Sequence, residues 1–365
     1  MRYTIVEGGH SAASGGLDPA GNSAPDPADA GGAGRAAGAG AVVPGAAGGK
    51  AFPADCGDFD VTKPFAVYLA PYGFEADLEE ELRRSGRRIV FRRGRLIGAE
   101  QTPLAAVWAH NVWLEPRFLP AVSIRSAAAE LTALQRNWAL FSTVEHRRAA
   151  LIEEALPRVS AKPLVFGAPV PSAPLGSWTL WSRDWLLASA RCSSPFAHGE
   201  ARFVEDKDGP PNRAYLKLWE VFSRIGRCPG PGDLCLDLGS SPGGWTFVLA
   251  ELGARVFSVD KAPLAPWVAR HDHVEYCKGS AFGFEPRLAG NITWLFSDVA
   301  CFPEKLYDMV AKWIDADVRA NMICTIKFAG RTDFAALDSF LRIQGSFAMH
   351  LFANKHEVTW IRLVN

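Results

Sequence analysis

From residue 211 onward, short apolar segments alternate with segments of helical periodicity, and this alternation strongly limits the possible fold. Strands that alternate with helices predict a parallel, doubly wound α/β sheet. The last two apolar segments, 347–352 and 357–364, must be antiparallel, because a parallel crossover needs about a dozen residues and their link is shorter. We expect the other strands at 234–238, 255–260, 274–278, 292–297 and 322–328, and helices at 212–225, 243–252, 304–315 and 333–344.

The first 62 residues have a composition unlike that of the rest of the chain. Thirteen glycines and thirteen alanines fall within the first 50 positions. Such a segment buries too little apolar surface to offset the entropy cost of ordering it. We expect residues 1–62 to be disordered, unless translation starts further in. Asp18, Asp26 and Asp29 argue against a transit peptide.

Residues 63–122 are expected to form a small α+β module. Strands are predicted at 65–69 and 88–91, with a helix at 75–85 between them. Seven arginines lie between positions 83 and 95. They form either a phosphate-facing patch or a solvated helix face whose charge the glutamates at 79–81 balance. On the first interpretation, the nucleic-acid contacts come from Arg87, Arg88, Arg92 and Arg93.

Residues 123–200 give weaker signals. Residues 123–160 are rich in alanine and leucine and are predicted to be helical, whereas 163–176 reads as a strand flanked by proline- and glycine-containing loops. Trp178, Trp181 and Trp185 follow a helical spacing. That spacing is more typical of a buried stripe than of a surface on which bases stack.

The composition excludes several classes of protein. No apolar run reaches the ~18 residues of a membrane span, and no apolar signal region follows the N-terminus. The seven cysteines include no CxxC pair, so we expect reduced thiols, no metal site and a cytoplasmic protein. A net charge of zero disfavours general attraction to nucleic acid, but residues 63–200 carry 17 basic against 13 acidic residues.

The segment 237–245, Asp-Leu-Gly-Ser-Ser-Pro-Gly-Gly-Trp, follows an apolar strand and opens a helix. Open α/β sheets bind nucleotides at this place, beyond the carboxyl end of a strand. Gly239 permits a tight turn there. Gly243 and Gly244 allow a ligand to approach the backbone closely.

Two nucleotide cofactors compete for this loop. A dinucleotide site requires G-x-G-x-x-G, whereas the loop reads G-x-x-x-G-G. A sulfonium cofactor has no phosphate to bind, and Asp237 suits the positive charge of its amino acid portion. Asp260 ends the next predicted strand, where a carboxylate can accept both ribose hydroxyls of an adenosine. We therefore predict S-adenosylmethionine (SAM) as the cofactor.

The loop resembles the cofactor loop of the FtsJ (RrmJ) family of RNA ribose 2′-O-methyltransferases. The resemblance implies a Rossmann-like SAM-dependent methyltransferase fold for residues 201–365, with a mostly parallel sheet and a closing antiparallel hairpin. It also implies a set of cofactor-binding residues. These are Asp237, Gly239, Ser241, Pro242, Gly243, Gly244, Trp245, Asp260, Ser280 and Asp298.

The family uses a Lys-Asp-Lys-Glu tetrad, and Lys217, Asp298, Lys327 and Glu357 match its members in order. The resemblance implies that Lys327 acts as general base, with a pKa lowered by desolvation and by the neighbouring Lys217. Asp298 would orient Lys327. Glu357 would position Lys217 or the ribose.

Upstream segments resemble the RlmM branch of the family, whose members modify large-subunit ribosomal RNA. Residues 71–75 and 192–196 carry this similarity. It implies a ferredoxin-like module at 63–122, whose arginines would contact RNA, and a reduced THUMP-like or linker region at 123–200. The chain departs from the branch at Ser280, where an aspartate is usual, and at Ala214, where a serine is usual.

The predicted function is SAM-dependent methyl transfer to a ribose 2′-hydroxyl of RNA, in large-subunit ribosomal RNA or its precursor. No membrane and no obligate protein partner are expected. The alternatives are a catalytically inactive RNA-binding protein that retains the fold, a SAM methyltransferase acting on another substrate, and a dinucleotide oxidoreductase. The target nucleotide, the maturation state of the RNA and the oligomeric state stay open.

Overall fold

A seven-stranded sheet forms the C-terminal part of the protein, which a computed structural model describes over residues 59–60, 62–160 and 162–364. Its strand order is β11-β10-β9-β12-β13-β15-β14. The first five strands are parallel, and β15 runs antiparallel to both β13 and β14, as predicted. The strands are β9 (Leu234–Leu238), β10 (Arg255–Asp260), β11 (Val274–Lys278), β12 (Trp294–Ser297), β13 (Asn321–Lys327), β14 (Ser346–Met349) and β15 (Glu357–Arg362).

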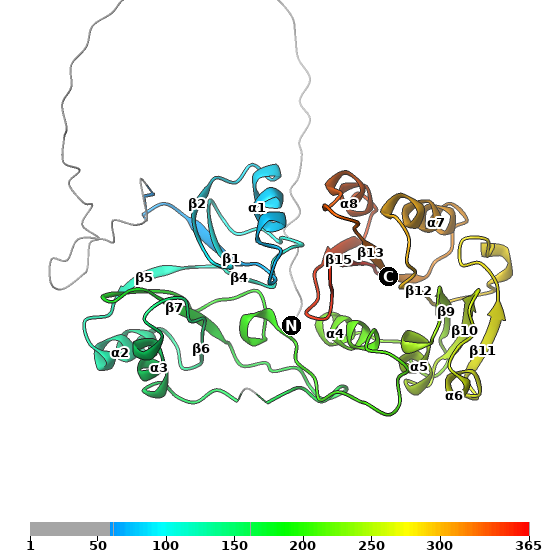
Figure 1. Cartoon of the computed structure of the whole chain (residues 1–365), viewed down its shortest axis with the longest axis horizontal. Helices are drawn as coiled ribbons and strands as arrows, with labels where there is room; N and C mark the ends of the chain where they lie inside the picture. Colours follow the sequence, from blue (N-terminus) through cyan, green and yellow to red (C-terminus); the bar gives the residue numbers. More distant parts are fainter. Residues whose placement is uncertain (1–58, 61, 161, 365) are drawn as a thin grey trace, which may run out of the picture. The chain divides into compact units, whose positions relative to one another are not determined.

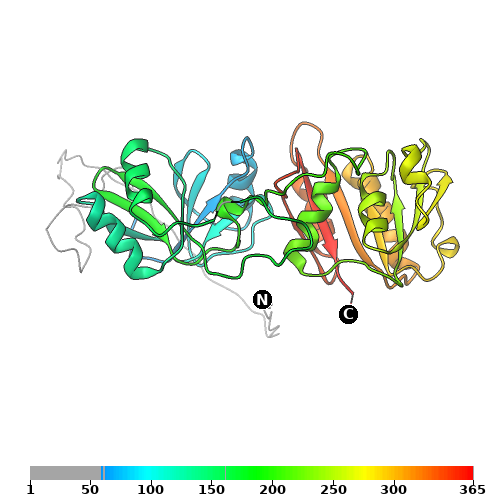
Figure 2. The same ribbon diagram turned by 90° about the horizontal axis from the view of Figure 1, so that it is seen from below.

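Helices cover both faces of this sheet (Figure 1). The apolar stripe of α4 packs with α5 on one face, where Figure 2 shows both helices in front of the strands. The stripes of α7 and α8 bury against the other face. This two-sided burial identifies a doubly wound α/β domain. The helices are α4 (Tyr215–Ile225), α5 (Gly244–Glu251), α6 (Pro266–Ala269), α7 (Pro303–Asp315) and α8 (Phe334–Leu341), with a short 3₁₀ turn at Pro286–Leu288.

A second sheet, of order β2-β3-β1-β4, forms the N-terminal module. Strands β1 and β2 lie parallel on either side of β3, connected through α1, which is a split β-α-β arrangement. The strand order is that of a ferredoxin-like module, but residues 101–110 form a loop where a second crossover helix would lie. The elements are β1 (Phe65–Leu69), α1 (Glu75–Arg84), β2 (Ile89–Arg93), β3 (Leu96–Glu100) and β4 (Asn111–Trp113).

The third sheet has the order β5-β8-β7-β6, with helices α2 and α3 packed on it. Strand β5 falls within the range predicted for the first module, but it pairs with β8. A short 3₁₀ turn at Ala197–Gly199 follows this sheet. Its elements are β5 (Arg117–Pro120), α2 (Ile124–Leu134), β6 (Trp138–Leu140), α3 (His146–Glu154), β7 (Gly176–Ser182) and β8 (Trp185–Ser189).

Three predictions for residues 123–200 were wrong in part. A strand, β6, interrupts the predicted helical stretch, and 163–176 forms no strand beyond one isolated bridge at Leu164. Trp178, Trp181 and Trp185 are buried as predicted, but on a β-hairpin and not on a helix. Trp178 packs into one core, and the other two pack into a second core on the opposite side of the sheet. Because both faces of this hairpin are buried, the spacing of the three tryptophans does not indicate a helix.

The predicted disordered tail lies outside the described residues, except at its end. There Phe59 is buried against Phe65, with ring centroids 5.0 Å apart, so packing begins before residue 63. Among the described residues, no helix is long and apolar enough to cross a membrane.

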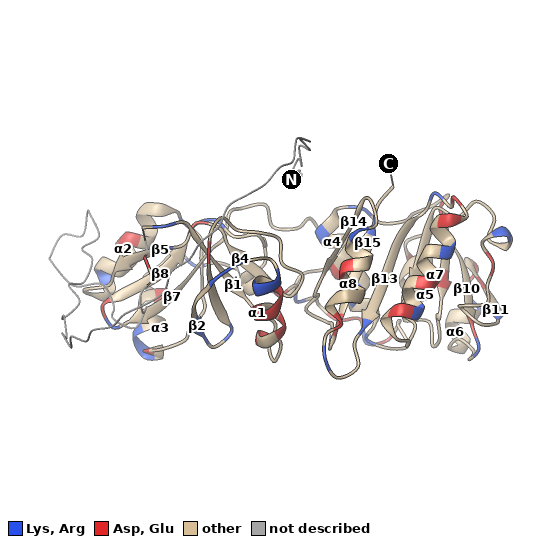
Figure 3. Cartoon of the chain, turned by 90° about the horizontal axis from the view of Figure 1, so that it is seen from above, with Lys and Arg blue, Asp and Glu red and all other residues tan. Residues whose placement is uncertain are grey.

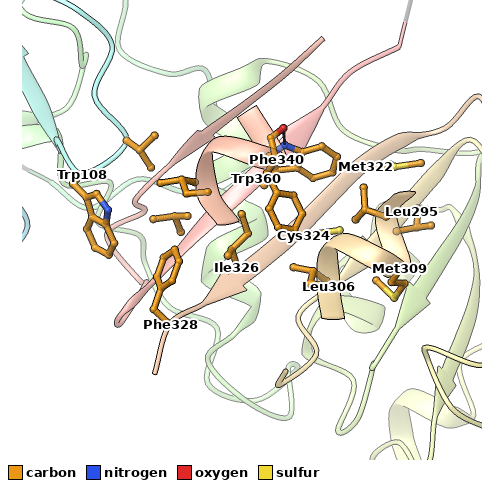
Figure 4. Close-up of a cluster of buried hydrophobic side chains, with 14 of the residues drawn as sticks. Trp108, Leu295, Leu306, Met309, Met322, Cys324, Ile326, Phe328, Phe340 and Trp360 are labelled. Carbon is orange, nitrogen blue, oxygen red and sulfur yellow. Dashed lines mark hydrogen bonds between the residues drawn. The ribbon is translucent and has the colours of Figure 1, made fainter. Parts of the chain in front are cut away.

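The N-terminal module contacts two loops of the C-terminal domain. The Nε2 of His110 lies 3.0 Å from the Nδ1 of His350, and the backbone N–H of His350 donates to the carbonyl of Val107. Trp108 packs beside Phe328, at one end of a row of apolar side chains that continues into the sheet (Figure 4). The loops 328–333 and 350–356 are therefore held between the two parts.

Candidate active site

Four charged side chains from four separate segments meet at one edge of the seven-stranded sheet. The Nζ of Lys217 lies 3.0 and 3.1 Å from the two carboxylate oxygens of Asp298 and 2.7 Å from Oε1 of Glu357. The Nζ of Lys327 donates to the backbone carbonyl of Asp298 at 2.7 Å and lies 3.0 Å from its Oδ1. Asp298 thus bridges the two lysines, and the four residues of the predicted tetrad form one cluster.

Chain topology explains this convergence. Asp298 follows β12 and Lys327 ends β13, so both lie at the carboxyl edge of adjacent parallel strands. Glu357 begins β15, which is antiparallel, and it pairs directly with Lys327. Lys217 reaches the same edge from the first turn of α4.

The four side chains differ in accessibility. Lys217 and Glu357 are 8% and 10% exposed and Asp298 is 16% exposed, whereas Lys327 is 28% exposed. Lys327 is therefore the most open member of the cluster and the one that a substrate can best reach.

The glycine-rich loop adopts a conformation that side chains would prevent. Gly239 has φ +82°, and a Cβ there would lie 2.6 Å from a carbon of Val299. At Gly244 a Cβ would lie 2.1 Å from the amide oxygen of Asn212. Glycine at both positions lets the loop close over the start of α5. The peptide bond between Ser241 and Pro242 is cis.

Asp237 lies in the wall of the pocket beneath this loop. It is buried, and its Oδ2 accepts a 2.7 Å hydrogen bond from Thr246, whose hydroxyl also contacts that of Ser258 at 2.7 Å. Burial raises the pKa of Asp237 to about 7, while the Thr246 hydrogen bond acts in the opposite direction. The carboxyl group is thus bound into the protein interior at the edge of the pocket.

Asp260, at the end of β10, holds the loop from the other side. Its two oxygens accept from the backbone N–H groups of Ser241 and Ala262, at 3.0 and 2.9 Å. A carboxylate has about four acceptor sites, so two remain for a ligand. Ser280 lies beyond β11, next to Gly279, whose N–H donates to the carbonyl of Asp260.

The pocket fits the amino acid end of a nucleoside cofactor. Its lining includes Ser240, whose buried hydroxyl has no hydrogen-bond partner among the described residues. An unpaired buried hydroxyl is costly unless a ligand satisfies it. Asp298 belongs both to the pocket lining and to the tetrad, so the pocket lies directly beside the tetrad. The lining consists of Asn212, Ala214, Asp237, Gly239, Ser240, Ser241, Gly244, Trp245 and Asp298.

Sequence reasoning missed Asn212, Ser240 and Thr246. Asn212 accepts from the N–H of Ala214 through Oδ1 and lies against Gly244, which is far away in sequence. The indole of Trp245 donates to the carbonyl of Ala214 at 2.9 Å and so ties the loop to the segment that carries Lys217. Ser240 could have been found from the sequence, because it belongs to the glycine-rich loop itself. Asn212 could not, because its role depends on the contact between its segment and that loop.

The predicted RNA-contacting arginines do not lie at this site, and each has a partner within the chain. Arg87 donates to Gln101, and Arg88 donates to both carboxylate oxygens of Glu100. Arg92 lies 3.2 Å from Glu79. Arg93 contacts the carbonyl of Trp181, and its guanidinium carbon lies 3.8 Å from the centre of that indole ring. On α1 the acidic residues precede the two arginines of the last turn, so opposite charges lie close together, as Figure 3 shows.

Comparison with known proteins agrees with this geometry. Residues 210–361 match the FtsJ-like methyltransferase family. The chain is similar to the Ribosomal RNA large subunit methyltransferase M of Halorhodospira halophila, with 34% identity over 158 residues, covering 41% of this chain and 46% of that protein. It is also similar to the protein of that name from Marinobacter nauticus, with 32% identity over 147 residues, covering 39% and 40%.

The chain therefore spans about half, or less, of the length of the curated relatives it matches. The matched region contains the glycine-rich loop and all four tetrad residues. The resemblance predicted from those residues is confirmed, and residues 210–361 form an FtsJ-like methyltransferase domain.

Proposed function

We propose that the protein transfers a methyl group from SAM to a ribose 2′-hydroxyl of RNA, in the large-subunit ribosomal RNA or its precursor. The observation that carries the proposal is the cluster of Lys217, Asp298, Lys327 and Glu357 beside the glycine-rich loop. The names of the similar proteins support a ribosomal RNA substrate, and such a substrate favours a cytoplasmic location.

SAM would supply a methyl group bound to a positively charged sulfur, which an oxygen nucleophile can attack. Asp260 has acceptor sites left for the ribose hydroxyls, and Ser280 lies next to it for the adenine. Ser240 and Asp237 line the other end of the pocket, where the amino acid portion would bind. Asp298 lines the pocket and also belongs to the tetrad, so it would lie between cofactor and base.

The hydrogen-bond acceptors around the two lysines support different roles for them. Lys217 has three carboxylate oxygens within 3.1 Å of Nζ, which match the three N–H groups of an ammonium. Lys327 has two acceptors, both on Asp298, which leaves one position on its Nζ for the 2′-hydroxyl. As a general base, it would accept a proton at that position.

These roles define a reaction scheme. Lys327 accepts the proton of the 2′-hydroxyl as the oxygen attacks the methyl group, and Asp298 orients Lys327 through two contacts. Glu357 and Asp298 hold Lys217, whose positive charge offsets part of their negative charge. Alignment of the oxygen and the methyl group supplies much of the rate. Ribose chemistry requires RNA, since DNA lacks the 2′-hydroxyl.

The test is transfer of labelled methyl from SAM to unmodified large-subunit ribosomal RNA, followed by nucleoside analysis. We expect a 2′-O-methylated nucleoside with the wild type. Lys327→Ala should lower turnover by about 10²- to 10⁴-fold. Lys327→Arg is the matched control, because it keeps the positive charge but cannot lose its proton.

Each alternative function has a distinct outcome in this test. SAM binding without methyl transfer to any RNA would select an inactive RNA-binding protein. Methyl transfer that survives RNase treatment of the substrate would select another substrate class. Wild-type turnover in Lys327→Ala would contradict the assignment of the base.

A further inference from the structure

Several large aromatic side chains of the described chain are exposed to solvent. Four phenylalanine, tyrosine or tryptophan residues of the described chain are exposed: Tyr72 (85%), Phe302 (67%), Trp267 (50%) and Phe352 (39%). Exposing such rings to water is unfavourable, so exposed rings on segments that lead to a candidate site suggest a ligand. Phe302 lies in the loop that follows Asp298 and Phe352 in the loop that precedes Glu357, whereas Trp267 lies on α6 and Tyr72 in the loop before α1.

Phe302 stands nearest the tetrad in sequence. It follows Asp298 by four residues and ends the loop between β12 and α7. Pro303, buried at the first position of α7, fixes the backbone beside it. The neighbouring Cys301 lies within electrostatic reach of both Lys327 and Lys305, which places this loop beside the base.

Phe352 and Tyr72 lie on two other segments of the chain. Phe352 lies in the loop that leads to Glu357, and its N–H donates to Glu220 at 2.8 Å, which fixes the loop. The guanidinium carbon of Arg202 lies 5.4 Å from its ring centre. Tyr72 lies in the loop before α1, two residues from Phe74, whose ring centre lies 5.4 Å from that of His356, the residue before Glu357.

Trp267 belongs to a different part of the edge. Its indole donates to the carbonyl of Gly209, and its neighbour Val268 packs against Gly243 in the cofactor loop. We therefore assign Trp267 to the border of the cofactor pocket and leave it out of the surface described next.

Positive charges accompany the three remaining rings. Arg331 is exposed in the loop that follows Lys327, and Lys355 is exposed in the loop that precedes Glu357. Aromatic rings interspersed with cations are typical of surfaces that bind single-stranded nucleic acid, because bases stack on the rings and phosphates contact the cations. A duplex keeps its base faces stacked inside and cannot use such rings.

We propose that Tyr72, Phe302 and Phe352 stack on unpaired bases next to the target ribose, so that the RNA segment in the active site is single-stranded. This inference rests on the proposed function for its substrate and adds the form in which that substrate is bound. It also gives the N-terminal module a direct part in binding, through Tyr72.

The test is equilibrium binding, measured by fluorescence anisotropy, to a labelled oligouridine of about 12 nucleotides and to its duplex with oligoadenosine. We expect the full chain to bind the single strand more tightly than the duplex at equal salt. Phe302→Ala should weaken single-strand binding roughly tenfold, which is the loss of one stacked base. Phe302→Trp should retain the wild-type affinity.

Leu341→Ala is the matched control, because Leu341 is an exposed apolar residue at the far end of α8 and should leave binding unchanged. Tyr72→Ala repeats the test on the N-terminal module. Circular dichroism of each variant identifies loss of folding.

Unchanged affinity in folded Phe302→Ala and Tyr72→Ala, or tighter binding of the duplex, would overturn the inference. Binding needs no methyl transfer, so these results stand apart from a failed methylation assay. Where methylation is observed, Phe302→Ala should raise KM for RNA and leave kcat and SAM affinity unchanged. A fall in kcat at unchanged KM would count against stacking.

Discussion

Two networks of paired charges occur in this protein, and they differ in almost every physical respect. One is the tetrad, in which two lysines and two carboxylates from four segments meet within 3.1 Å of each other. The other is the arginine segment 83–95, whose members contact carboxylates on α1, on β3 and on more distant segments, and, for Arg87 and Arg93, a neutral acceptor. The tetrad is mostly buried, whereas most of the arginines are exposed.

Burial decides what each network can do. An exposed ion pair is screened by water and salt and contributes little to stability. A buried pair contributes little net energy when complete but is costly to break, because one charge is left without a partner. The tetrad is thus intolerant of single changes. The exposed arginines remain free to exchange a carboxylate for a phosphate.

The largest effect that would test this contrast is expected from Lys217→Ala. Removing this ammonium leaves Glu357 unpaired and leaves Asp298 with Lys327 alone. We expect the free energy of unfolding to fall by about 4 kcal/mol, with methyl transfer lost as well. Urea denaturation measures the first effect. Arg84→Ala, which breaks an exposed pair with Asp338, is the control, and equal losses in both variants would refute the contrast.

A smaller effect is expected from a third pair, which has no carboxylate. His110 and His350 are buried against each other, and burial lowers the pKa of His350 from 6.5 to about 4. The folded state therefore binds fewer protons than the unfolded state between these values. The stability present above pH 6.5 is lost as the pH falls toward 4, by up to roughly 3 kcal/mol.

Other groups titrate in the same pH window, so a variant is needed to isolate this effect. The raised pKa of Asp237 acts in the opposite direction, because the folded state there retains a proton that the unfolded state has lost. Subtracting the stability profile of His350→Asn from that of the wild type removes such shared contributions. A difference that does not change between pH 6.5 and 4 would rule out the role of His350.

The smallest effect on folding is expected from Arg87, Arg88 and Arg92, changed together to glutamine. The contacts of Arg87 and Arg88 are exposed, and the partner of Arg92, Glu79, keeps its contact with Arg83, so thermal unfolding should stay near that of the wild type. If these residues contact RNA, binding should weaken and its salt dependence should become shallower, by about 0.7 in the logarithmic slope for each phosphate lost. If the salt dependence of RNA binding does not change, these arginines have a structural role only.

The C-terminal domain could be predicted from sequence in much more detail than residues 63–200. Strands β9, β10 and β11 begin and end where they were predicted. The signal is clearest for β9, which is almost entirely buried and reads as an apolar block. The tetrad was predicted residue by residue from its order along the chain. The pairing of β5 with β8 was not predicted, because it joins segments about 70 residues apart and no local sequence pattern indicates it.

The same limit applies within the site. The loop glycines were recognised because their conformations are local, with positive φ at Gly239 and Gly243. Asn212 was missed because its importance comes from its contact with Gly244 across the pocket. The tryptophan hairpin was read as a helix because burial on both faces of a sheet removes the alternation that identifies a strand.

Lys327 and Glu357 form the last opposed pair of the β13–β15 ladder. Successive side chains of a strand point to opposite faces, so a shift of one residue in this pairing would turn one member away from the other. The apolar residues Val358, Trp360 and Ile361 hold the alignment by their burial in the two cores. A substitution in these cores that loosens the strand can therefore separate Glu357 from Lys327 while the domain remains folded, and catalytic failure then precedes any loss of structure.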